Sequence, residues 1–342
     1  MSKRRLSGRQ IERIQAIQER RRQRLAERVD TILATLDEEG TATEAPPREG
    51  RVVVRHGASL AVEDDDGVIW HCLSRQNIGH PVCGDRVVWQ PTADDRGVVT
   101  AILPRQTLLS RPDHAGRDKP LAANLTLLII LIAPRPEPSD YLLDQYLIAA
   151  ESIGVAALIV ANKMDLLDAR ERDAFQARFA HYPAVGYPML WTSVGDRDSL
   201  DGLIAHLKGQ TSILVGQSGV GKSSLVKALL PDRAIQIGRL SQATGLGRHT
   251  TSAATYYRLR DHGALIDSPG VRSFRLGTLD RATLEHGFRE LRPYLGRCRF
   301  ADCRHDQEPG CAIRAAILSG AITPRRLDNF HHLLAESERS TP

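Results

Sequence analysis

The order of two short motifs constrains the fold of this chain of 342 residues more than any other feature. Asn162-Lys163-Met164-Asp165 stands ahead of the glycine-rich run Gly216-Gln217-Ser218-Gly219-Val220-Gly221-Lys222-Ser223. Both motifs have a nucleotide-binding interpretation. In an ordinary GTPase, however, the glycine-rich loop comes first and the tetrapeptide follows well after it. Here that order is reversed, and any fold proposed for the chain must account for the reversal.

The glycine-rich run has the flanks that a phosphate-binding loop requires. Residues 212–215 form an apolar run of strand length, and residues 224–230 have helical spacing. Backbone N–H groups of such a loop converge on phosphate oxygens, Lys222 supplies charge to the β- and γ-phosphates, and the Ser223 hydroxyl can bind Mg²⁺. The alternative, a chance glycine turn, is disfavoured by the complete spacing. The residues assigned to the nucleotide are Gly216, Gln217, Ser218, Gly219, Val220, Gly221, Lys222, Ser223 and Ser224.

The tetrapeptide follows an apolar, β-branched run at residues 155–160, which places it at the carboxyl end of a strand, where open α/β sheets bind ligands. The Asp165 carboxylate can accept hydrogen bonds from the N1–H and 2-amino groups that guanine carries and adenine lacks. Asn162 can contact the other edge of the ring. A surface turn after a strand is the alternative. We expect GTP and GDP as ligands, with base contacts from Asn162, Lys163, Met164, Asp165 and, in a later polar loop, Ser193.

A second strand-and-loop pair completes a hydrolytic site. Residues 263–266 form a predicted strand that ends in Asp267, which can hold the Mg²⁺ shell, and the Gly270 N–H can sense the γ-phosphate. Upstream, a polar, glycine-containing loop carries Thr250 and Thr251, one of which we expect to close over Mg²⁺ and the γ-phosphate. The sequence does not separate the two threonines.

The usual water-positioning residue is missing. Where Ras-like proteins carry a Gln, directly after Gly270, this chain has Val271, which has no hydrogen-bonding group. His249 is the best local candidate for the catalytic residue, because a neutral imidazole can accept a proton from water. The alternative is a solvated loop histidine or one that touches a partner. We expect slow intrinsic turnover that a partner stimulates.

A cluster near the C-terminus has the pattern C-x₄-C-x-H-x₅-C, formed by Cys298, Cys303, His305 and Cys311. Three thiolates and one imidazole are a complete tetrahedral set for one structural Zn²⁺. A disulfide with an idle histidine is the alternative. A reducing compartment and the total of five cysteines disfavour it.

Composition and periodicity divide the chain into four segments. Residues 1–49 are a basic arm with an acidic linker, expected to become helical on RNA, the alternative being a solvated helix without a partner. Residues 50–113 contain five short strands, which fit a small OB-fold barrel that binds RNA. Residues 114–275 alternate strands and helices, which predicts a parallel, doubly wound α/β sheet, and residues 276–342 form a helical domain around the metal cluster.

Charge and hydropathy bound the choice of partner and compartment. The formal charge of +5 favours an anionic partner. No apolar stretch reaches the roughly 18 residues of a membrane span, and the N-terminus has no apolar signal core. We expect a cytoplasmic monomer.

Taken together, the motif order, the run Gly247-Arg248-His249-Thr250-Thr251, the run Asp267-Ser268-Pro269-Gly270-Val271-Arg272 and the cysteine cluster resemble those of the circularly permuted, ribosome small-subunit-dependent GTPases of bacteria (RsgA/YjeQ type). The resemblance covers about residues 50–334. It implies an OB-fold, a permuted GTPase domain, a zinc domain, and a role on the 30S subunit and its 16S rRNA in late maturation, with hydrolysis coupled to release.

Two functions from other classes remain open at this stage. A P-loop ATPase or small-molecule kinase would need ATP preference, which the tetrapeptide opposes. An RNA-binding protein that uses nucleotide without significant hydrolysis is compatible with Val271.

Overall fold

The computed structural model describes residues 45–57, 59–75, 78–92, 96–112, 118–244, 254–260, 263–268 and 279–340. Several predicted features lie outside these residues: most of the basic arm, and His249, Thr250, Thr251, Gly270 and Val271. Among the described residues, no helix combines the length and apolar character needed to cross a membrane.

The first described domain is a closed five-stranded barrel. Its strands are β1 (Arg48–His56), β2 (Ser59–Glu63), β3 (Ile69–Ser74), β4 (Arg86–Thr92) and β5 (Arg96–Ile102). They pair in the order β1-β2-β3-β5-β4, and β4 returns to β1, which closes the barrel. The fully buried Trp89 fills its centre, and a Cβ at Gly97 would lie 2.7 Å from that indole. The predicted OB-fold is confirmed.

A second domain is built on a six-stranded portion of the sheet. Its strands are β8 (Leu127–Ile132), β9 (Ala156–Ala161), β10 (Met189–Trp191), β11 (Thr211–Val215), β12 (Thr255–Arg258) and β13 (Ala264–Asp267). The order is β10-β9-β8-β11-β13-β12, and only β12 runs antiparallel to its neighbour. All six residues of β8 are buried, as expected for a central strand covered on both faces.

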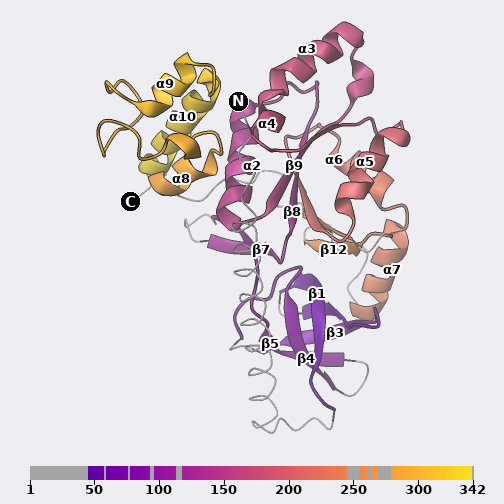
Figure 1. Ribbon diagram of the computed structural model, residues 1–342. Helices are drawn as coiled ribbons and strands as arrows, with labels where there is room; N and C mark the ends of the chain where they lie inside the picture. The colour runs from indigo at the N-terminus through magenta and orange to yellow at the C-terminus, as the bar shows by residue number, and fades with distance from the viewer. Residues whose placement is uncertain are drawn as a thin grey trace, which may run out of the picture.

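Helices cover both faces of this sheet (Figure 1). They are α2 (Asp140–Ile153), α3 (Ala169–Phe179), α4 (His181–Ala184), α5 (Asp198–Leu207), α6 (Lys222–Leu229) and α7 (Arg233–Thr244). Helix α2 begins where the Ser139 hydroxyl accepts from the Leu142 N–H, and it ends at Gly154, whose φ of 73° is left-handed. The predicted α/β domain is confirmed, and the strand before the tetrapeptide, β9, precedes the strand before the glycine-rich loop, β11, in the chain.

The barrel is joined to this sheet. Strand β1 pairs with β12 through Val54 and Thr255, and Arg51 donates to the Tyr256 hydroxyl at 2.5 Å. Helix α7 also packs against β2 and β3 of the barrel (Figure 1). A two-stranded hairpin, β6 (Leu108–Pro112) with β7 (Asp118–Ala123), connects the barrel to β8 and was not among the predicted strands.

The C-terminal domain is helical and packs on α2. Its elements are α8 (Arg281–Gly287), α9 (Ala312–Leu318) and α10 (Pro324–Ser340), with a short 3-10 segment, η4 (Arg292–Tyr294). A Cβ at Gly287 would lie 2.9 Å from Cγ2 of Ile148 in α2, so the two helices touch backbone to side chain. The fully buried Asp144 of α2 accepts hydrogen bonds from Tyr182 at 2.7 Å and from Asn329 of α10 at 2.6 Å, and it pairs with Arg326.

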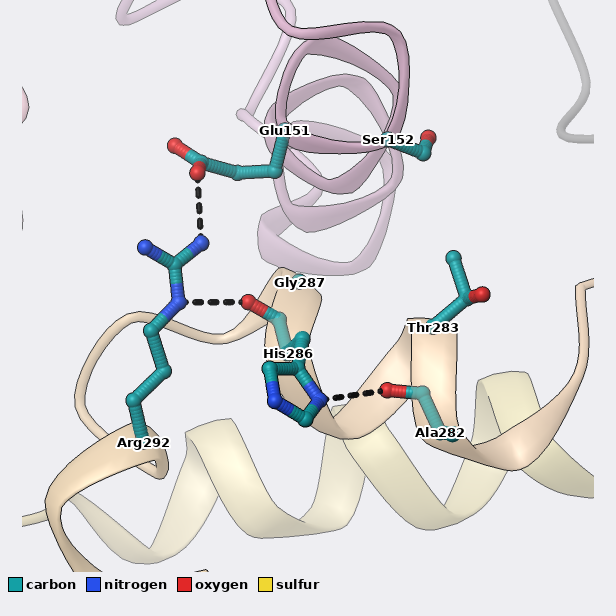
Figure 2. Close-up of a pocket in the computed structure, with 7 residues that line it drawn as sticks. All are labelled: Glu151, Ser152, Ala282, Thr283, His286, Gly287 and Arg292. Atoms are coloured by element: carbon teal, nitrogen blue, oxygen red, sulfur yellow. Dashed lines mark hydrogen bonds and ion pairs between the residues drawn. The ribbon is translucent and has the colours of Figure 1, made fainter. Parts of the chain in front are cut away.

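A pocket of about 370 Å³ opens between α2 and α8. Figure 2 shows Arg292 bridging the two sides of this pocket, donating to the Glu151 carboxylate at 2.5 Å and to the His286 carbonyl at 2.7 Å. Glu151 also accepts from Arg289 at 2.7 Å. Arg289 and Arg292 therefore bond the C-terminal end of α2 to the C-terminal domain.

Candidate nucleotide site and metal cluster

The glycine-rich run lies between β11 and α6, as the sequence predicts. Gly216, Gly219 and Gly221 have φ values of 139°, 83° and 99°, which favour glycine over residues with a side chain. A Cβ at Gly216 would lie 2.2 Å from the Leu131 carbonyl oxygen. The loop is therefore pressed against the end of β8, and its backbone conformation depends on the absence of side chains.

The phosphate-loop lysine is folded over its own loop. Lys222 Nζ donates to the carbonyl oxygens of Gly216 at 2.6 Å and Gln217 at 2.5 Å. The neighbouring Ser223 and Ser224 are exposed at the start of α6. This geometry places a cation and two hydroxyl-bearing residues at one helix N-terminus, a favourable position for phosphate.

The tetrapeptide contacts the phosphate loop directly. Asn162 is 1% exposed, and its side chain donates through Nδ2 to the Val220 carbonyl at 3.0 Å. Lys163 has a φ of 63°, and its Nζ donates to the Gly219 carbonyl at 2.5 Å. The two motifs, which the chain presents in reverse order, thus meet at one edge of the sheet.

The remaining base-loop candidates lie beside the tetrapeptide. The backbone N–H of Asp165 donates to the Ser193 hydroxyl at 3.0 Å, and the Ser193 N–H donates to the Ser199 hydroxyl at 2.9 Å. The Met164 N–H donates to the Thr192 carbonyl at 3.2 Å. Asp165 itself is exposed, so its carboxylate is accessible to a ligand.

Asp267 stands at the end of β13, the strand next to β11. Its Oδ2 lies 2.6 Å from Nη2 of Arg233, the first residue of α7. The sequence gives no local signal for this partner, because the two residues are 34 positions apart and belong to different elements.

The cysteine and histidine side chains converge as predicted. One ligand atom from each of Cys298, Cys303, His305 and Cys311 lies within 4.8 Å of the others. His305 Nδ1 is 3.5 Å from Sγ of both Cys298 and Cys311. All five cysteines of the chain are free, so the disulfide alternative is wrong in this structure. Burial raises the pKa of the Cys303 thiol to about 12, so its thiolate needs a nearby cation.

A carboxylate outside the cluster orients the histidine. Glu285 Oε1 lies 3.3 Å from His305 Nε2, the ring nitrogen that faces away from the sulfur atoms. Arg281 in turn donates to Glu285 at 2.6 Å and also to the Cys303 carbonyl. Metal-binding histidines commonly donate their second N–H to such a carboxylate. Sequence reasoning missed Glu285, which lies 20 positions before His305 and outside the C-x₄-C-x-H-x₅-C pattern.

The fold and the site define a P-loop GTPase in which the strands are circularly permuted. The sequence model of the RsgA GTPase family matches residues 102–277. Curated relatives named small ribosomal subunit biogenesis GTPase RsgA align along nearly the whole chain. The relative from Marinobacter nauticus is 43% identical over 98% of this chain and 97% of its own. The relative from Pseudomonas aeruginosa strain UCBPP-PA14 is 44% identical over 98% of both. This chain belongs to the RsgA GTPase family.

Solved structures agree with this membership. YjeQ from Thermotoga maritima is similar with a TM-score of 0.71 and 30% identity, covering 85% of this chain and 99% of that one. YloQ, described as a circularly permuted GTPase, is similar with a TM-score of 0.69 and 28% identity, covering 86% of this chain and 96% of that one.

Proposed function

We propose that this protein is a GTP hydrolase that acts in the biogenesis of the small ribosomal subunit. The observation that carries the proposal is the contact of Asn162 and Lys163 with the phosphate loop, made across a permuted chain order. A guanine-type tetrapeptide in that position supports GTP over ATP. The names of relatives that are 43% and 44% identical along the whole chain support the small subunit as the partner.

The described residues fit a guanine nucleotide with Mg²⁺. The phosphate loop is a backbone cradle that Cβ atoms would obstruct, and Asn162 Oδ1 is buried without a hydrogen-bond partner among the described residues. In this proposal residues 216–224 hold the phosphates, and Asn162, Lys163, Met164, Asp165 and Ser193 hold the base. Ser223, Asp267 and either Thr250 or Thr251 hold Mg²⁺, which neutralises charge on the phosphates when bound.

Hydrolysis requires a proton acceptor near the attacking water, and the proposal assigns that role to His249, with the Gly270 N–H at the γ-phosphate. His249→Ala should cut subunit-stimulated hydrolysis by roughly 10²-fold while nucleotide binding survives. Single-turnover rates with and without subunits measure this. Parent-like stimulated rates in the variant would move the catalytic role to another group, most plainly one supplied by the ribosome.

The RNA-facing parts in this proposal are the barrel and the basic arm, with 16S rRNA as their ligand. A cytoplasmic monomer binds the subunit in its GTP form and leaves after hydrolysis, late in maturation. The Cys298, Cys303, His305 and Cys311 set fits one structural Zn²⁺, since four ligands complete a tetrahedral shell and leave no open position for chemistry.

The test combines binding with turnover. The protein should retain small subunits when loaded with a nonhydrolysable GTP analogue and release them with GDP, and it should hydrolyse GTP in preference to ATP. Retention without any hydrolysis, even with subunits present, would favour the nonenzymatic RNA-binding alternative. A preference for ATP would favour the P-loop ATPase.

A further inference from the structure

The carboxylate assigned to the magnesium shell already has a cationic partner in this structure. Arg233 Nη2 lies 2.6 Å from Asp267 Oδ2, and the two side chains are only 28% and 25% exposed. Partial burial strengthens such a charge-assisted hydrogen bond relative to one at an open surface. Asp267 Oδ2, the carboxylate oxygen that faces α7, is therefore already bound by the Arg233 guanidinium.

Arg233 is held in place by contacts of its own. Its guanidinium carbon lies 5.2 Å from the centre of the Tyr257 ring, on the strand next to Asp267. Its backbone N–H donates to the Leu230 carbonyl at 3.1 Å, which fixes the start of α7. The helix itself packs against barrel strands β2 and β3 (Figure 1). Arg233 thus reaches Asp267 from α7, a helix whose position is set by its packing against the barrel.

A guanidinium and a magnesium shell compete for one carboxylate. Mg²⁺ binds through carboxylates, waters and nucleotide phosphates, and its attraction to Asp267 depends on the negative charge that Arg233 neutralises. We propose that Arg233 is a displaceable counter-ion of Asp267, which lowers the Mg²⁺ affinity of the resting protein and withdraws when Mg²⁺ and nucleotide bind. The inference rests on the proposed role of Asp267 in the magnesium shell.

The phosphate-loop lysine follows the same pattern. Lys222 Nζ donates to two carbonyl oxygens of its own loop, in the place where phosphate oxygens are expected. The charged groups on both sides of the nucleotide site are therefore satisfied by the protein, and binding must exchange these internal partners for ligand atoms. Arg233 differs from Lys222 in one respect: it lies outside residues 216–224, to which the phosphates are assigned, so its charge can be removed without changing the phosphate loop.

The experiment is a Mg²⁺ titration of fluorescent GDP binding to the full chain. Arg233→Met and Arg233→Gln should each lower the half-saturating Mg²⁺ concentration by about tenfold, the scale of one charged hydrogen bond. Arg233→Lys should stay close to the parent, because it keeps the competing charge. Arg260→Met is the matched control: Arg260 pairs with Asp232 at 3.0 Å beside the start of α7, away from the carboxylate, and should leave the titration unchanged.

An unchanged or higher Mg²⁺ requirement in both neutral variants, with parent-like thermal unfolding, would show that the ion pair only fastens α7 to β13. If Arg233→Met folds poorly, the more polar Arg233→Gln variant carries the test. Asp267→Asn separates the two levels of the argument. If that change leaves the Mg²⁺ dependence intact, the assignment of Asp267 fails, whereas an altered dependence there with parent-like Arg233 variants overturns the counter-ion alone.

Discussion

The cysteine cluster and the nucleotide site hold their reactive groups in opposite ways. In the cluster, four ligand atoms from one stretch of 14 residues, 298–311, already lie within 4.8 Å of one another. In the nucleotide site, Lys222 and Lys163 donate to loop carbonyls and Asp267 is paired with Arg233. A permanent ligand suits a closed, converging set. A ligand that is exchanged in every catalytic cycle suits charged side chains that bond to other protein groups when the ligand is absent.

The largest effect is expected at the phosphate loop. Lys222→Ala should reduce GTP turnover by at least about 10³-fold, because it removes the cation that faces the β- and γ-phosphates. Turnover and thermal unfolding should be measured together, since the fold should persist. Lys227→Ala, on the exposed side of the same helix, is the control. Full GTP turnover in the Lys222 variant would refute the assignment of this loop as the phosphate-binding part of a nucleotide site.

Removing one ligand should dismantle the cluster while sparing the exchangeable site. Cys303→Ser should lose the metal and loosen the C-terminal domain, because an incomplete shell binds Zn²⁺ far more weakly. Zinc content per chain and GDP affinity are the two measurements, and GDP affinity should change little. A parent protein that purifies folded without zinc would contradict the assignment.

Base discrimination provides a smaller test of the nucleotide site. Asp165→Asn should weaken GDP binding by about 2 to 4 kcal/mol, because the carboxylate that accepts from two guanine donors is lost. Calorimetric titration measures the change. Xanthosine diphosphate should regain affinity in the variant, since its 2-carbonyl accepts from an amide N–H. Equal GDP affinity in variant and parent would place the base elsewhere.

The smallest effect is expected outside the cluster itself. Glu285→Ala should weaken Zn²⁺ binding by about 10- to 100-fold, because His305 loses the carboxylate that fixes its ring. Competition with a chelator measures the affinity, and Glu285→Gln should fall between the alanine variant and the parent. Glu338→Ala, which removes an exposed carboxylate of α10 paired with Arg304, should have no effect. Loss of zinc in both Glu285→Ala and Glu338→Ala would mean that substitutions destabilise the C-terminal domain in general.

Local patterns predicted much of this architecture, and distant pairings did not follow from them. The strand, loop and helix around Lys222 and the five barrel strands are encoded in short runs of alternating or helical spacing. Helix α3 carries a weaker signal, because Phe179 is its only buried residue and Phe175, which packs beside it, is only partly buried. It is fixed instead by a capping box between Asp168 and Glu171.

The candidate site shows the same division. Residue type and spacing predicted where the phosphate loop and the tetrapeptide lie and that the four Cys and His side chains converge, while the roles of these residues toward a ligand stay predictions. The partners Arg233 and Glu285 could not be predicted, because an arginine or glutamate on a helix is compatible with many solvated positions. Only the fold decides that α7 begins beside β13, or that α8 presents Glu285 to His305.

The contact between Gly287 and Ile148 has a consequence for how this chain can evolve. At residue 287 a methyl group would come within 2.9 Å of Cγ2 of Ile148, so the isoleucine or one of the two helices would have to shift to admit it. Tolerance to substitution along the chain is therefore not set by distance from the nucleotide. Position 287 belongs to neither the phosphate loop nor the cysteine cluster, yet it should tolerate few substitutions. A larger residue there would require a smaller residue at position 148.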